Sequence, residues 1–128
     1  MASVMRSGIE VLNDIPGTGA PVERHRWYRI RVRMWLHKGD PVRWDRPWGT
    51  SPMSLEDDGT TLLTHVRIDR EKLIAGLFYG CAGMRVHGRR RLRIAPRLAF
   101  RERGVPGVVP PHALLVAEIE ILGEGLPG

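Results

Sequence analysis

The sequence has little of what marks a secreted or membrane protein. Cys81 is its only cysteine, so no disulfide can form within the chain. No apolar run approaches the roughly 18 residues that a membrane-spanning helix needs. The opening residues, MASVMRSGIEVLND, contain no apolar segment of secretory length. We therefore expect a protein of the reducing cytoplasm with no membrane partner.

Patterns for metal or thiol chemistry are also missing. The five histidines show no metal-binding spacing such as His-x-x-x-His. The acidic run Glu56–Asp58 lacks the loop pattern of a calcium site, so a solvated turn is the simpler interpretation. Cys81 has apolar neighbours, which is typical of an inert small side chain rather than a reactive thiol. We expect no metal and no cofactor.

The composition indicates one globular domain spanning residues 1–128. Hydrophobic residues make up 42% of the chain and charged residues 27%, and the length is sufficient to bury a core. The 15 glycines and 10 prolines are spread along the sequence, which indicates turns between short strands. No internal repeat and no linker divides the chain. The formal charge of +6 permits binding to an acidic surface without showing it.

The clearest strand is WYRIRVRMWL, residues Trp27–Leu36. Apolar residues alternate there with arginines, which predicts a half-buried strand with its apolar face inward. The inward residues are Ile30, Val32 and Met34, and the outward ones are Arg29, Arg31 and Arg33. Further strands are expected at Gly8–Val11, Leu62–Ile68, Arg89–Pro96 and Ala113–Leu122.

The best helix signal lies in IDREKLIAGLFYGCAGM, residues 68–84. Asp69 is a candidate N-cap, and apolar residues follow near helical spacing: Leu73, Ile74, Leu77, Cys81 and Met84. Three glycines within this segment each weaken a helix by roughly 1 kcal/mol. They indicate a short helix packed tightly against another element. The expected fold is an α+β domain with about five antiparallel strands and one helix.

The C-terminal half of the chain resembles a known family. GVPGVVPPHALLVAEIEIL (residues 104–122) is similar to the C-terminal signature of FKBP-type peptidyl-prolyl isomerases, and LIAGLFYGCAGMRVHGRRRLRIAP (residues 73–96) resembles the segment before it. Upstream, Trp44-Asp45 matches the family's phenylalanine-aspartate pair, and Ile15-Pro16-Gly17 its early turn. The resemblance covers about Gly8 to Leu122. It implies an insertion at about 46–63, expected as a mobile loop or short hairpin beside the site.

The resemblance implies a twisted antiparallel sheet wrapped around one short helix, with an apolar pocket between them. The implied activity is rotation about X-Pro peptide bonds, which needs no nucleophile, metal or general base. The implied partners are proline-containing segments of proteins and, weakly, macrolide drugs. The resemblance places the loop from Phe100 to Pro111 at one rim of the pocket. Its prolines restrict the backbone, so Val108 and Val109 can be held against a ligand with little entropy left to lose.

The resemblance also assigns roles to individual residues. The residues implied in catalysis are Trp44, Asp45, Ile74, Phe100 and Val109, with the Ile74 N–H donating to a substrate carbonyl. The residues implied in binding are Met34, Leu73, Leu77, Val108 and Ala117. Four of these depart from the usual aromatic residues: tryptophan is usual at Leu77, tyrosine at Phe100 and Met34, and phenylalanine at Ala117. We therefore expect reduced catalysis and weak drug binding. Trp48 and Phe78 are two residues that could refill the floor at Leu77.

The arginine clusters allow two interpretations. On the implied strand order, the last strand lies between the other two, so that Glu118 and Glu120 would be flanked by arginines. We predict ion pairs from Arg29 or Arg31, and from Arg91 or Arg93, to these glutamates. A guanidinium would also stack on Trp35. This structural role is favoured over nucleic-acid binding. Two functions stay as alternatives to the isomerase: a non-catalytic peptide- or protein-binding module, and a basic adaptor for RNA.

Overall fold

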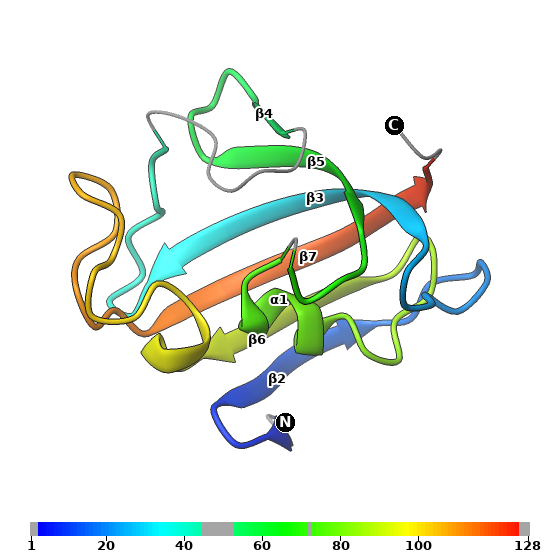
Figure 1. Ribbon diagram of the computed structural model, residues 1–128, viewed down its shortest axis with the longest axis horizontal. Helices are drawn as coiled ribbons and strands as arrows, with labels where there is room; N and C mark the ends of the chain where they lie inside the picture. Colours follow the sequence, from blue (N-terminus) through cyan, green and yellow to red (C-terminus); the bar gives the residue numbers. More distant parts are fainter. Residues whose placement is uncertain (1–2, 45–52, 72, 126–128) are drawn as a thin grey trace.

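Seven strands form a single antiparallel sheet around one short helix (Figure 1). The computed structural model describes residues 3–44, 53–71 and 73–125. In these ranges the strands are β1 (Ser3–Arg6), β2 (Ile9–Ile15), β3 (Trp27–Leu36), β4 (Met53–Leu55), β5 (Thr61–Arg67), β6 (Arg89–Ile94) and β7 (Leu115–Glu124). The helices are α1 (Ala75–Gly80) and the 3₁₀ helix η1 (Pro96–Leu98). The sheet order is β1-β2-β6-β7-β3-β5-β4.

The α+β fold is confirmed, but the sheet has seven strands where about five were expected. The two additional strands lie at the edges of the sheet. β1 has four residues and β4 has three, and both are held by backbone pairing to one neighbour. Segments so short carry no alternation of apolar and polar residues, and their sequence therefore gives no strand signal. The described part of the chain contains no helix with the length and apolar character needed to span a membrane.

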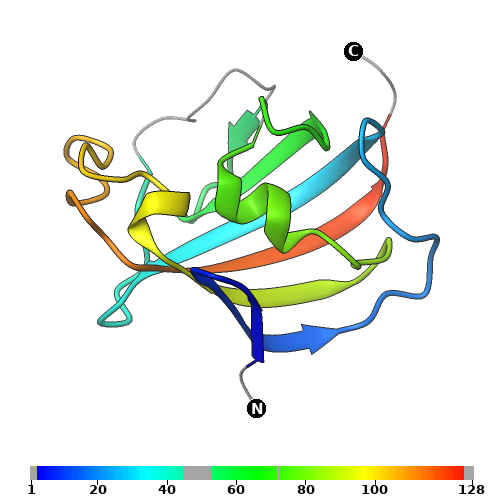
Figure 2. The same cartoon turned by 60° about the horizontal axis from the view of Figure 1, so that its bottom comes forward.

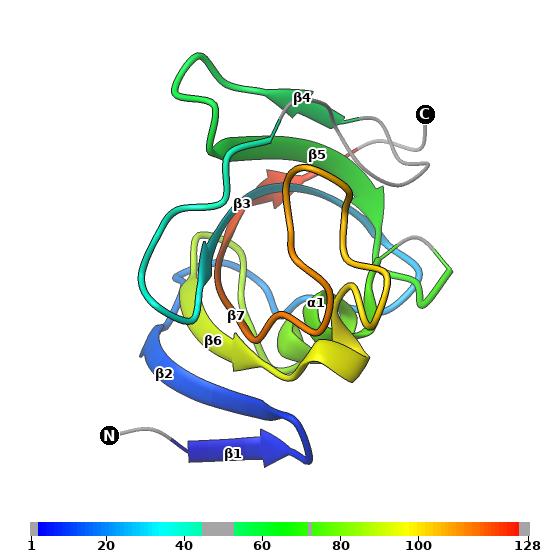
Figure 3. The same ribbon diagram turned by 90° about the vertical axis from the view of Figure 1, so that its left-hand side faces the viewer.

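The alternation in β3 divides the sheet into two faces as predicted. Ile30, Val32 and Met34 are buried, whereas Arg29 and Arg33 are exposed. The central strand β7 alternates in the same way and buries its own apolar residues: Leu115, Ala117, Ile119 and Ile121. The buried face is concave and curls around α1, which lies across it (Figures 2 and 3). The core therefore sits between the helix and the sheet.

The helix is shorter than residues 68–84 and begins without the predicted cap. It has six residues and its N-cap is Ile74, which makes no side-chain capping bond. Asp69 instead accepts a hydrogen bond from the Glu71 N–H at 2.9 Å and pairs with Arg67 at 2.7 Å, all upstream of the helix. The hydrogen bond from the Glu71 N–H has the largest effect on the pKa of the Asp69 carboxyl and lowers it. The acidic group thus shapes the turn before α1.

Two helix glycines allow the tight packing that the sequence indicated. A Cβ atom at Gly76 would lie 2.5 Å from Ile94 Cγ2 and 3.1 Å from the carbonyl oxygen of Leu98. A Cβ at Gly80 would overlap the side chain of Leu92. Since Ile94 and Leu92 belong to β6 and are fully buried, the helix backbone rests directly on this strand.

The outer face of the sheet carries the expected acidic strand between basic ones. In the strand register Glu120 lies opposite Arg31 on one side and Arg89 on the other. Arg31 pairs with Glu120 at 2.9 Å, and Arg89 approaches the same carboxylate at 3.7 Å. Arg91 stacks over the Trp35 ring, with 4.5 Å between the guanidinium carbon and the ring centroid. The structure therefore confirms the pairing of Arg31 with Glu120 and the stacking on Trp35.

On the β6 side the ion pair with Glu120 comes from Arg89, and not from Arg91 or Arg93 as predicted. Arg93 pairs at 3.1 Å with Glu10 of β2, which lies directly opposite in the register. The sequence showed β2 only as a short strand of Gly8–Val11, without its register. Once β2 extends to Ile15 and pairs with β6, Glu10 becomes the nearest acidic neighbour of Arg93.

One arginine faces the core, which the sequence pattern did not indicate. Arg90 is 6% exposed and lies on the concave face of β6. Its Nη1 donates to the carbonyl oxygens of Gly80 at 2.9 Å and Ala82 at 2.6 Å. Its Nε donates to the Asp14 carboxylate at 3.2 Å. The positive charge thus satisfies carbonyls at the C-terminal end of α1, where cations are favoured.

Replacing Arg90 with methionine should lower the free energy of unfolding by about 3 kcal/mol, since it removes charged hydrogen bonds at a buried position. Arg91→Met is the matched control on the outer face of the same strand. It should lower the free energy of unfolding by about 1 kcal/mol or less, the worth of one exposed cation–π contact. Urea denaturation measures both. Equal losses in the two variants would contradict the role given to Arg90.

Gly76→Ala tests the contact between α1 and β6. Helix propensity alone predicts a gain of about 1 kcal/mol for this change. We expect instead a net loss of about 1–3 kcal/mol, because the new methyl group must displace Ile94 or the backbone at Leu98. Denaturant unfolding at one pH decides the sign. A variant more stable than the wild type would show that a methyl group fits between α1 and β6 at this position.

Candidate functional site

Three segments meet at one end of the concave face. They are the N-terminal end of α1, the loop between η1 and β7, and the segment that follows β3 (Figure 3). Of the ten residues that the resemblance assigned to the site, nine are described by the structure, and these three segments carry seven of them. The other two, Met34 and Ala117, lie on β3 and β7.

The N-terminal end of α1 presents a free backbone donor. Leu73 is buried, and Ile74 has an extended backbone with φ −59° and ψ 152°. The Ile74 carbonyl accepts hydrogen bonds from the N–H groups of Leu77 at 3.1 Å and Phe78 at 3.0 Å. Within the described ranges nothing accepts a hydrogen bond from the Ile74 N–H. N–H groups at a helix start have no partner inside the helix. The Ile74 N–H can therefore bond to a ligand carbonyl.

The rim loop, residues 100–112, is held as a tight hairpin. Val105 and Val109 exchange two backbone hydrogen bonds of 2.9 and 2.8 Å. Gly107 makes the turn with φ +77°, a value that favours glycine. At the base of the loop the His112 N–H donates to the Arg101 carbonyl at 2.8 Å. The loop backbone is therefore fixed before any ligand binds.

The same loop carries the two valines that were assigned to the site. Val109 is buried and Val108 is half-buried, and both pack against the main core. Gly104, with φ +64°, lies against the Val109 carbonyl and Pro110, so that a larger residue there would push the hairpin open. Packing and backbone bonds together hold the two valine side chains in place.

An aromatic pair forms the wall next to this loop. The Trp44 and Phe100 rings meet edge to face, with centroids 5.9 Å apart and planes at 63°. Such pairs are worth about 0.5–1.5 kcal/mol beyond the area that they bury. Trp44 is 4% exposed, and its backbone N–H donates to the Gly59 carbonyl at 2.9 Å. The predicted neighbour Asp45 lies outside the described residues.

The described part of the insertion is a short hairpin. β4 pairs with β5, and the turn between them brings Gly59 to Trp44. Asp58 organises this turn: it accepts a 2.6 Å hydrogen bond from the Thr61 hydroxyl and 2.9 Å bonds from the Thr60 and Thr61 N–H groups. These hydrogen bonds hold the pKa of the Asp58 carboxyl well below its usual range, and the bond from the Thr61 hydroxyl has the largest effect. The hairpin therefore supports the tryptophan wall.

The resemblance places Met34 and Ala117 at the base of the site. They lie opposite each other in the register of β3 and β7, and both are fully buried. A methionine side chain is flexible and alanine is small, which leaves the base adaptable. Their contact with a ligand stays a prediction.

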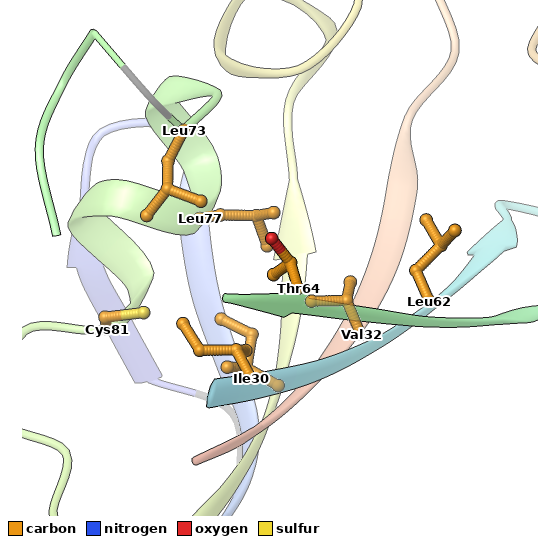
Figure 4. A pocket seen from close by; sticks show the side chains of 8 residues that line it. Ile30, Val32, Leu62, Thr64, Leu73, Leu77 and Cys81 are labelled. Carbon is orange, nitrogen blue, oxygen red and sulfur yellow. The ribbon is translucent and has the colours of Figure 1, made fainter. Parts of the chain in front are cut away.

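Leu77 is buried, and behind it lies an apolar hollow between α1 and the sheet (Figure 4). The hollow is lined by Leu73, Leu77 and Cys81 from the helical segment, and by Ile30, Val32 and Leu62 from the strands, among others. Phe78 does not fill this space: its ring packs against Tyr79, with centroids 5.1 Å apart, and lies under Arg24. Trp48 lies outside the described residues.

The site offers no group for acid–base, nucleophilic or metal chemistry among its described residues. No cluster of three or more metal-binding side chains occurs in the described ranges. Burial raises the pKa of the Cys81 thiol to about 12, so it stays protonated at neutral pH. Apolar side chains and the Ile74 N–H, which has no acceptor in the described part of the chain, suit a neutral ligand containing an amide.

The hollow behind Leu77 was not predicted from the sequence. Ile30, Leu62 and Thr64 line it from the strands, where their inward positions look like ordinary core. The only signal available was the absence of a large side chain at Leu77. The space behind it depends on how closely α1 approaches the sheet, which no single residue reveals.

Comparisons with known proteins agree with this architecture. A sequence model of the family described as FKBP-type peptidyl-prolyl cis-trans isomerase matches residues 56–122, more than half of the chain. "Peptidyl-prolyl cis-trans isomerase FPR2" from Saccharomyces cerevisiae is 49% identical over 51 residues, covering 40% of this chain and 38% of that protein. "FK506-binding protein" from Neisseria meningitidis is 41% identical over 51 residues, covering 40% of this chain and 47% of its own length.

The same fold occurs among solved structures. The crystal structure of AtFKBP13 superposes with a TM-score of 0.76 and 24% sequence identity, covering 98% of this chain and 99% of that one. The matched segments of the two curated relatives span less than half of each protein. On the family model and the fold together, this chain belongs to the family of FKBP-type peptidyl-prolyl cis-trans isomerases.

Proposed function

We propose that the chain catalyses cis–trans isomerisation of X-Pro peptide bonds in protein segments, at the site between α1 and the rim loop. The observation that carries this proposal is the Ile74 N–H, which has no acceptor among the described residues and belongs to a half-buried residue packed against the apolar core. Family membership supports the reaction class. Assistance to protein folding and a cytoplasmic location are part of the proposal.

The mechanism follows from the electronic structure of the amide. Rotation about the X-Pro bond breaks amide resonance, which sets a barrier of about 18–20 kcal/mol. The planar amide is more dipolar and better hydrated than the twisted one, so an apolar environment disfavours the ground state relative to the transition state. The walls at Trp44, Phe100 and Val109 exclude water, and the Ile74 N–H orients a substrate carbonyl. No chemical bond is broken or formed in the reaction.

The fixed rim loop contributes to binding. A flexible loop would lose conformational freedom when a peptide binds, at about 1–2 kcal/mol for each residue that becomes ordered. Here the backbone bonds between Val105 and Val109, and between Arg101 and His112, are already made. The loop therefore meets the peptide with little further ordering.

The departures at four site residues weaken the proposed activity. Leu77, Met34 and Ala117 provide less aromatic surface than the residues that the resemblance leads us to expect. Phe100 has no hydroxyl group to donate to a substrate carbonyl. We propose weak turnover and weak binding of macrolide drugs. A non-catalytic module for proline-containing segments is the alternative, and the missing hydroxyl at Phe100 favours it.

Isomerase activity is tested by NMR exchange spectroscopy on a short Leu-Pro peptide. The wild-type protein should accelerate exchange between the cis and trans peptide signals. Phe100→Tyr should raise kcat/KM about twofold to tenfold, the effect of one additional hydrogen bond formed in the transition state. Phe78→Tyr adds the same hydroxyl to a ring that packs against Tyr79 and Arg24, away from the site, and should change nothing.

Two outcomes would contradict the proposal. If Phe100→Tyr, Phe78→Tyr and the wild type had equal isomerisation rates, the rim residue at position 100 would have no part in catalysis. If neither the wild type nor Phe100→Tyr accelerated cis–trans exchange, catalysis would be excluded. If the peptide still bound, the non-catalytic module would replace the enzyme.

A further inference from the structure

We propose that the ligand site continues behind Leu77 into the apolar hollow, and that the chain therefore binds a proline ring carrying one additional methyl group more tightly than proline itself. This inference rests on the proposed function, since it names the ring that the same site prefers. It concerns the space behind Leu77 and not the walls or the rim.

The hollow and the site share a wall. Leu73 and Leu77, both assigned to the site, also line the hollow (Figure 4). With Leu77 at the floor of the site, as the resemblance implies, its single branched side chain stands between the ligand and the hollow, and this side chain can change rotamer. Cys81 closes the far end, four residues later on the same face of the helical segment. A ligand group that displaces the end of Leu77 therefore enters the hollow directly.

The hollow has room for one small apolar group. It leaves about 10 Å³ for the centre of a water-sized sphere, which is the space of roughly one water molecule. A methyl group is of similar size. Every lining side chain except Thr64 is apolar, and water needs two to four polar partners to occupy such a space. The hollow is therefore best filled by a methyl group and not by water.

The hollow cannot close by movement of the helix. Gly76 and Gly80 already touch Ile94 and Leu92 of β6, so α1 cannot move closer to the sheet. On the other side of α1, the side chains of β3 and β5 do not reach far enough to fill the gap. The space is thus a consequence of the same glycine contacts that place the helix.

Cys81 allows the hollow to be changed without altering the site. It is 2% exposed and has no role in the walls or the rim. Cys81→Val adds volume at the far end of the hollow, whereas Cys81→Ala removes volume there. Leu77 and the other assigned site residues are the same in both variants.

The test uses two N-acetylated Leu-Pro amides, one with proline and one with 4-methylproline, the latter as both diastereomers. Dissociation constants come from titrations of the ¹⁵N-labelled protein. The better methylproline diastereomer should bind the wild type about fourfold more tightly than the proline peptide, the worth of one buried methyl or methylene group. Cys81→Val should abolish this preference and leave the affinity for the proline peptide unchanged. Cys81→Ala should retain or increase it, which keeps the test decisive if the valine variant does not fold.

Three results would overturn the inference. The first is that the methylproline peptides bind the wild type no more tightly than the proline peptide. The second is that Cys81→Val keeps the same preference for methylproline as the wild type. The third is that Cys81→Ala loses the preference for methylproline. In each of these cases binding of the proline peptide leaves the proposed function intact. A wild-type protein that binds neither peptide would overturn the proposed function, and the inference with it.

Discussion

Gly76 and Gly80 bring the α1 backbone onto the side chains of Ile94 and Leu92, closer than any residue with a Cβ allows. Each glycine weakens the helix by roughly 1 kcal/mol, and α1 has only six residues. Tertiary packing therefore decides both where this helix forms and where it ends. Arg90 supports the same arrangement, because its guanidinium binds the carbonyls of Gly80 and Ala82 at the helix end.

The position of α1 determines the chemistry available at the site. It packs the half-buried Ile74, whose N–H has no acceptor among the described residues, against the core, and it places Leu77 over the sheet. It also leaves the hollow between the helix and the strands. The outer face of the sheet has a different role: Arg31, Arg93 and Arg91 are engaged there by Glu120, Glu10 and Trp35 respectively. These contacts use the basic residues to organise the sheet, which is why the charge of +6 does not by itself indicate a nucleic-acid site.

The elements predicted well are those whose residues alternate strongly. β3 has the predicted bounds, because three arginines alternate there with buried apolar residues. The glycines correctly indicated a short, tightly packed helix. The sequence could not show that Asp69 would bind the Glu71 N–H instead of capping α1, since that choice depends on where the helix starts. The edge strands β1 and β4 carry too few residues for a pattern.

The site was predictable only where it depends on local sequence. The proline-glycine string of the rim loop is local, and its hairpin closes within that string. The contact between Trp44 and Phe100 joins residues far apart in the chain, and only the resemblance placed them in one site. The hollow depends on the distance between α1 and the sheet, and the partner of Arg93 depends on the register of β2. Both are properties of packing between distant segments.

The most direct test of the account is to locate the peptide on the protein. Amide signals of the ¹⁵N-labelled chain are followed while an X-Pro peptide is added. Shifts should concentrate at Ile74 and at Val108 and Val109 of the rim loop, and Ile74 should show the change expected when an N–H gains a hydrogen bond. Shifts confined to the outer face of β3 and β5, with Ile74 unchanged, would contradict the account.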